Sequence, residues 1–139
     1  VSVPEVFQMN PAVTSLDFES MAPGAVVFKT LGFTVTSNKG TGWSVMLSAS
    51  PMTRTVGGET LPASSFRYNI SGGGNGVYTP SGAALANVPT SPAVIYASGS
   101  GEGAVAGLAF GLGVQIDMPN TALAGSYSTT VNLNLVDSI

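Results

Sequence analysis

Two acidic residues, Asp17 and Glu19, have a spacing that catalysis or cation binding would use. Residues two apart lie on the same face of a β-strand, so both carboxylates would point the same way. Such a pair suits general acid–base catalysis or a hard cation such as Ca²⁺. No third acidic residue lies close to them in the sequence. We therefore favour a solvated strand edge, and hydrolysis of a surface polymer is only a third hypothesis.

The other side chains that could do chemistry are few. The 139-residue chain has no His and no Cys, and it has four Lys or Arg against seven Asp or Glu. Imidazole, thiolate and the metal ions that they bind supply most side-chain catalysis at neutral pH. We therefore expect a protein that is not an enzyme, with no catalytic residue, no metal ligand and no cofactor.

The charge distribution excludes two classes of partner. The basic residues Lys29, Lys39, Arg54 and Arg67 are scattered along a chain with a net charge of −3. A nucleic-acid partner requires clustered positive charge, so none is expected. The longest apolar run, residues 104–114, contains three glycines. It is far shorter than the roughly 20 residues of a membrane span, so we expect no membrane span either.

Charged residues make up 8% of the chain, against about a quarter in an ordinary domain. The surface must then consist largely of Ser, Thr, Asn and Gly, which is the composition we expect of a secreted protein at the cell surface. The sequence begins at Val1 without a basic, apolar leader. We expect either that a signal segment has been removed or that the chain is an excised domain.

Apolar and polar residues alternate with a period of two along most of the chain, as in half-buried β-strands. The clearest runs are residues 27–36, 43–50, 66–70, 93–97, 110–118 and 127–135. Nine prolines and 18 glycines interrupt the sequence at short intervals. The pattern predicts an all-β protein, a single Ig-like, Greek-key β-sandwich of about seven to nine strands over residues 1–139. We expect the first two runs to form a hairpin.

Two segments resemble the WxL-type cell-surface domains. The first, Phe33–Val45, passes from a strand through a polar turn and a Gly-Trp pair into the next strand. The second, Met118–Leu135, has the Pro-x-x-x-x-x-Gly-x-Tyr spacing of that family's closing strand. The resemblance implies a β-sandwich module that binds cell-wall glycan or a surface protein.

Two aromatic residues of these segments are predicted to be structural. Trp43 shares a strand face with the aliphatic residues that follow it, which favours a core anchor over a sugar-stacking ring. Tyr127 follows a glycine by two residues and resembles a corner tyrosine, whose hydroxyl bonds to the backbone. A glycan-binding module would instead expose aromatic side chains such as Tyr68, Tyr78 and Tyr96.

Three polar or glycine-rich stretches carry weaker signals. Residues 72–76 and 99–103 have the composition of phosphate-binding loops, but neither leads into a helix N-terminus. We expect them to be turns or flexible tips. The triplet Asn69-Ile70-Ser71 is an N-glycosylation sequon, which makes Asn69 a candidate glycosylation site.

The beginning of the chain alternates apolar and polar residues and contains a proline. Its apolar members are Val1, Val3, Phe7 and Met9. Proline within a strand is confined to sheet edges, so residues 1–10 are either an ordinary edge strand or a donor strand that completes the sheet of a neighbouring copy. We predict a structural subunit of a cell-surface assembly or pilin-like filament made of copies of this chain. The alternative is the WxL-like binding module.

Overall fold

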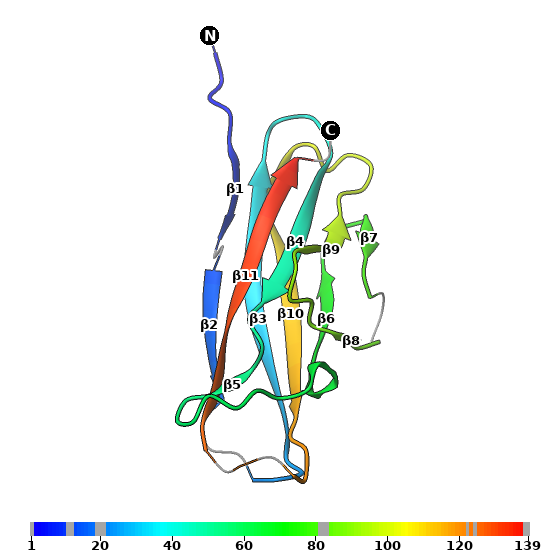
Figure 1. Cartoon of the computed structure of the whole chain (residues 1–139). Coiled ribbons are helices and arrows are strands. Elements are labelled where there is room, and N and C mark those ends of the chain that lie inside the picture. The colour runs from blue at the N-terminus through cyan, green and yellow to red at the C-terminus, as the bar shows by residue number, and fades with distance from the viewer. Residues whose placement is uncertain are drawn as a thin grey trace.

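The computed structural model describes residues 2–10, 13–18, 22–80, 84–121, 123 and 125–137, with the backbone alone at residues 10 and 13–18. These residues form two antiparallel sheets packed face to face, and their only helical element is a 3₁₀ turn, Ala63–Ser65. Figure 1 shows the long strands side by side along one axis. The prediction of an all-β sandwich is confirmed.

The first sheet has the strand order β1-β3-β10-β6-β8. Its strands are β1 (Phe7–Asn10), β3 (Val26–Ser37), β10 (Val105–Asp117), β6 (Phe66–Gly72) and β8 (Ala86–Asn87). The ladder between β3 and β10 runs from Val26 opposite Asp117 to Ser37 opposite Val105, with one shift of register. This long pair forms the centre of the sheet.

The second sheet has the order β2-β11-β4-β9-β7, with β5 paired to β11. Its strands are β2 (Val13–Phe18), β11 (Tyr127–Asp137), β4 (Trp43–Ala49), β9 (Ala93–Ala97), β7 (Val77–Tyr78) and β5 (Thr53–Arg54). Of the eleven strands in the described residues, β5, β7 and β8 have two residues each. The other eight strands agree with the seven to nine that the sequence predicts.

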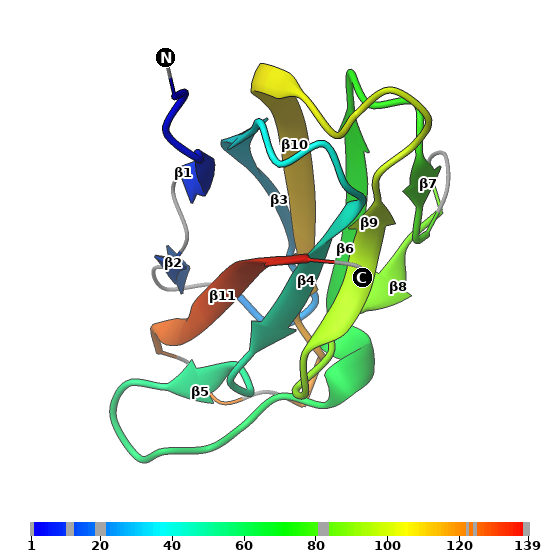
Figure 2. The same cartoon turned by 90° about the horizontal axis from the view of Figure 1, so that it is seen from above.

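The order of the longer strands is that of an Ig domain, whose sheets have the orders ABED and CFG. Strands β1-β3-β10-β6 correspond to ABED, and β4-β11 correspond to CF. The place of strand G, antiparallel to β11, is taken by β2. Strands β1 and β2 therefore each form one edge of a different sheet, and Figure 2 shows them on the same side of the sandwich.

The expected hairpin between the first two long strands is wrong. Strand β3 lies in the first sheet and β4 in the second, so the turn between them crosses the sandwich. In this turn Gly40 has a φ of +80°, and its N–H donates to the Gly103 carbonyl at 2.9 Å. The crossing allows both strands to bury their apolar faces in the same core.

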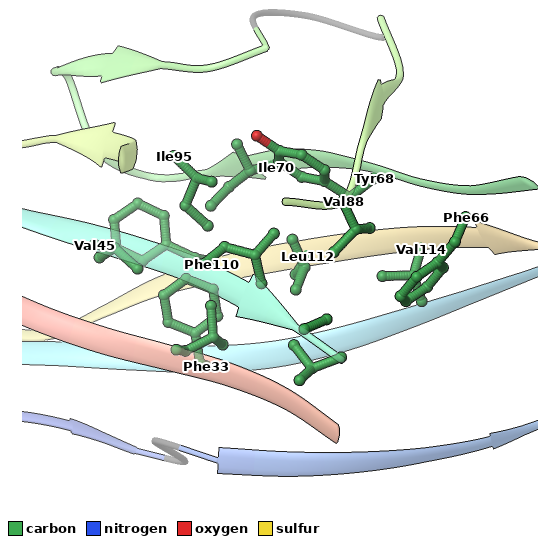
Figure 3. Packing of buried hydrophobic residues seen from close by; sticks show 14 of the residues in the cluster. Phe33, Val45, Phe66, Tyr68, Ile70, Val88, Ile95, Phe110, Leu112 and Val114 are labelled. Carbon is green, nitrogen blue, oxygen red and sulfur yellow. The ribbon is translucent and has the colours of Figure 1, made fainter. Parts of the chain in front are cut away.

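Alternating side chains from both sheets fill the space between them, as Figure 3 shows. Strand β10 contributes every second residue from Phe110 to Ile116, each at most 4% exposed. Aromatic rings gather around Phe110, with ring centres 5.2 Å away at Phe33, 4.7 Å at Tyr96 and 6.4 Å at Trp43. These rings hold the two sheets together because they come from both of them.

Replacing Trp43 by Ala should destabilise the fold by about 3–5 kcal/mol, because the indole is fully buried among these rings. This loss is a large part of the roughly 5–15 kcal/mol that stabilises a typical domain. Urea unfolding of the purified proteins measures it. The control is Val56→Ala, at a side chain 76% exposed, which should change stability by less than about 0.5 kcal/mol. An unchanged unfolding midpoint in Trp43→Ala would contradict the core assignment.

Candidate functional site

The candidate site is the edge segment, residues 2–10, together with the part of β3 that it contacts. Strand β1 pairs with the last four residues of β3, from Phe7 opposite Ser37 to Asn10 opposite Thr34. Phe7 and Met9 are half-buried and pack against the core, whereas Gln8 between them is exposed. The segment thus inserts alternate apolar side chains into the open side of the sandwich.

The residues before β1 run outside both sheets and rise above the neighbouring strands in Figure 1. Val3 is 78% exposed. The Asn38 carboxamide accepts a hydrogen bond from the Val6 N–H at 2.7 Å and donates one to the Pro4 carbonyl at 2.9 Å. The predicted strand begins only at Phe7, since Pro4 has no N–H with which to extend a ladder. Val1 lies outside the described residues.

Lys39 links the edge segment to the second sheet. Its ammonium lies 4.8 Å from the centre of the Phe7 ring, within the range of a cation–π contact. It is 3.7 Å from the Glu5 carboxylate and also pairs with Asp137 of β11. The hydrogen bond to Asp137 raises the pKa of Lys39, against an opposing effect of desolvation. Lys39 therefore remains cationic wherever the domain is folded near neutral pH.

Two of the surface recesses are lined by uncharged residues only. One of about 350 Å³ adjoins the edge segment and is lined by Val6, residues 36–38 and residues 104–106. Another of about 230 Å³ lies between residues 49–52 and residues 60–63 and is mainly apolar. Neither lining contains an ionisable side chain. These recesses could bind an apolar group but could not activate one.

The sequence analysis missed a buried charged residue, Glu102, which is 6% exposed. Its carboxylate accepts hydrogen bonds from the Gly99 N–H at 2.7 Å, from the Asn75 N–H at 3.0 Å and from the Tyr96 hydroxyl. The two glycine-rich stretches are therefore packed on each other around this carboxylate. The only sequence signal was a single acidic residue between glycines in a chain with few charges.

This network also includes Trp43, whose Nε1–H donates to the Glu102 carbonyl at 2.7 Å. Burial opposes ionisation of Glu102, but hydrogen bonds from Gly99, Tyr96 and Asn75 outweigh it and lower the pKa of the carboxyl. Burial raises the pKa of Tyr96, and its hydrogen bond to Glu102 adds to the effect. Neither group is poised to exchange a proton near pH 7, so the network is structural.

The remaining predicted site residues do not converge. Asp17 lies in β2 opposite Ser128 with only its backbone described, and Glu19 lies outside the described residues, so the carboxylate pair stays a prediction. Asn69 lies in β6 opposite Gly113.

Among the described residues, no group of three or more acidic, His or Cys side chains is placed to hold a metal ion. No helix in this part of the chain is long and apolar enough to span a membrane.

The tyrosines are largely withdrawn from solvent. Tyr68 and Tyr96 are 4% and 0% exposed, and Tyr78 is half-buried with its hydroxyl bonded to a backbone carbonyl. The exposed tyrosines that would favour glycan binding are therefore not found at these positions. Tyr127 is buried, and its hydroxyl donates to the Leu123 carbonyl at 2.8 Å, as in a tyrosine corner.

No protein-family model, no curated protein and no solved structure matches this chain. The resemblance to WxL-type domains therefore stays a prediction that rests on the sequence motifs.

Replacing Glu102 by Gln should destabilise the fold by about 1–3 kcal/mol, because an amide cannot accept every hydrogen bond that the carboxylate receives. Wild-type stability should be flat near neutral pH. It should fall as the pH drops below about 4.3, because a carboxyl whose pKa is lowered on folding loses its contribution when protonated. It should also fall above about pH 10, where tyrosine ionises in the unfolded chain but Tyr96 stays neutral in the folded one.

Urea unfolding across the acidic, neutral and alkaline ranges measures these limits. The matched control is Glu5→Gln, which changes an exposed carboxylate and should leave the acid-induced loss intact. An acid-induced loss of the same size in Glu102→Gln as in wild type would show that Glu102 is not its source.

Proposed function

We propose that this chain is a non-enzymatic, extracellular structural subunit that assembles with copies of itself by β-strand complementation, with residues 1–10 as the donor strand. The observation that carries the proposal is that β1 and β2, successive in the sequence, each form one edge strand of a different sheet. A neighbour's β1 would make the same ladder and the same apolar contacts. Exchange between copies therefore keeps these contacts at little cost in free energy.

The dimensions of β1 support exchange. The strand joins its sheet through four residue pairs, and its two inward side chains, Phe7 and Met9, are only half-buried. In strand complementation the backbone ladder provides affinity and alternate side chains provide specificity. Asn10 is followed by Pro11 in the sequence, and a proline favours an extended backbone at the residue before it. An extended backbone at Asn10 suits a strand that continues into a neighbouring sandwich.

The extracellular location rests on composition, since only 8% of residues are charged and none is Cys or His. The alternative function, a WxL-like module that binds cell-wall glycan or a surface protein, rests on the sequence motifs. In these motifs the aromatic residue that could stack on a sugar is Trp43, but its indole is fully buried and hydrogen-bonded. The position of this residue favours the assembly proposal over the binding module.

A cysteine pair at Gln8 and Thr36 should distinguish exchange from self-pairing, because these residues face each other across the β1–β3 ladder. The chain has no cysteine of its own, so the double variant contains one pair of thiols. Oxidation after assembly should give a ladder of covalent oligomers on a non-reducing gel, and reduction should abolish it. The single variant Gln8→Cys is the control and should give dimers at most. A disulfide closed within each monomer, with no ladder, would overturn the proposal.

Phe7→Asp should prevent elongation, because it places a charge where the donor strand meets the core. The matched control is Gln8→Asp on the exposed face of the same strand, which should still assemble. Electron microscopy and light scattering after size exclusion measure the outcome. A free peptide of residues 1–10 should bind Phe7→Asp in place of its own edge strand without restoring filaments. A wild-type chain that is monomeric at every concentration, under the conditions of its isolation, would count against assembly.

A further inference from the structure

The outer face of the first sheet carries the sequon. Tyr68 and Ile70 of β6 point into the core, at 4% and 1% exposure. Because successive side chains of a strand point to opposite faces, Asn69 and Ser71 point outward. The carboxamide and the hydroxyl of the sequon therefore lie on the same accessible face, with Asn69 half-buried and Ser71 exposed.

Glycines beside the sequon leave the outer face of the first sheet without side chains at their positions. Gly113 of β10 lies opposite Asn69, and Gly111 lies opposite Ser71. A Cβ on Gly111 would have no neighbour closer than the Ser71 hydroxyl at 3.7 Å, and one on Gly32 of β3 would meet open space. Because Gly111 and Gly32 lie opposite each other, they leave a shallow trough across β10 and β3 next to the sequon.

The side chain of Phe28 borders this trough. Its ring is 53% exposed, and its Cζ lies 2.6 Å from the point that a Cβ on Gly113 would occupy. The carboxamide oxygen of Asn69 reaches the same point, so the ring and the carboxamide lie side by side above Gly113. Single exposed rings are common on protein surfaces, but this one adjoins the amide of a sequon. No described residue hydrogen-bonds to the Asn69 carboxamide.

We propose that Asn69 carries an N-linked glycan whose first sugar lies in this trough and packs on Phe28. A pyranose presents a face of C–H groups, which suits the electron-rich face of an aromatic ring. The glycan would also hydrate the surface of a chain in which only 8% of residues are charged. The inference uses the secreted location of the proposed function but does not depend on strand exchange.

The transfer requires a polyprenyl-diphosphate-linked oligosaccharide and the transferase that uses it. Nδ2 of Asn69 attacks the anomeric carbon of the donor sugar, so that a C–N bond forms as the C–O bond to the diphosphate breaks. The diphosphate leaves with the electron pair of that bond, and a base of the transferase takes one amide proton. The Ser71 hydroxyl is the sequon group that the transferase recognises.

Intact-mass measurement of the chain secreted from a host with such a transferase tests the modification. Wild type should gain the mass of one glycan, and enzymatic release should remove it and leave Asp in place of Asn69. Ser71→Ala, at an exposed side chain, should stay unmodified. Ser71→Ala with an appended Asn-Gly-Thr tail is the positive control for the transferase. An unmodified wild type alongside a modified tail would overturn the proposal.

Thermal unfolding tests the packing on Phe28. The glycosylated chain should unfold about 2–4 °C higher than the enzymatically released one, the shift expected for a small stabilisation of a domain of this size. This difference should vanish in Phe28→Ala. It should persist in Val26→Ala, which removes a side chain of similar exposure, 59%, on the same face of β3. An undiminished difference in Phe28→Ala would reject the packing.

The glycosylation of Asn69 and the assembly by strand exchange can be tested on the same secreted protein, and either one can be wrong without the other. Glycan mass is measured on the denatured chain and does not depend on assembly. The cross-link pattern of the Gln8 and Thr36 cysteine pair reports strand exchange whether or not Asn69 is modified. A glycosylated chain that stays monomeric would support the glycan proposal and overturn the assembly proposal. An unmodified chain that polymerises would support the assembly proposal and overturn the glycan proposal.

Discussion

The hydrogen bond from the Trp43 indole to the Glu102 carbonyl is the interaction on which the rest of the structure depends. It fixes a ring between the two sheets and binds that ring to a loop. A carboxylate buried in this loop requires donors of its own, which Gly99, Asn75 and Tyr96 supply. Glycine-rich segments that could adopt many conformations are thereby held in one.

This network makes the two sides of the sandwich unequal. On the side of β9 and β7, the Phe110 ring of β10 packs against Trp43, Tyr78 and Tyr96 of the second sheet and so connects the two sheets. On the other side, β1 and β2 close the gap as successive parts of one run, and Phe7 and Met9 reach the core only partly. The stability of the domain thus lies mainly away from the edge segment. The proposed complementation requires such a division, because the core must stay formed while the edge strand comes from a neighbouring copy.

The sequence predicted the positions of the strands better than it predicted which strands pair in the sheets. Alternation placed strands at 110–118 and 127–135, close to the observed β10 and β11, because a period of two reports which residues face the core. It does not report which strand lies beside which, so the expected hairpin of β3 and β4 was wrong. Glu102 escaped notice for a similar reason. Its donors come from residues 75, 96 and 99, and only the folded loops bring them together.

The low charge of the surface has opposite consequences at edges and at faces. Natural sheets protect their edges with charged side chains that repel other strands, and a chain with 8% charged residues has few to spare. In the proposed assembly this is an advantage, because an edge that must accept a neighbour's strand should not repel it. The faces still need hydration to stay soluble, and charge does not provide it. A glycan at Asn69, on the outer face of the first sheet, would supply that hydration without obstructing β1, which pairs at the far end of β3.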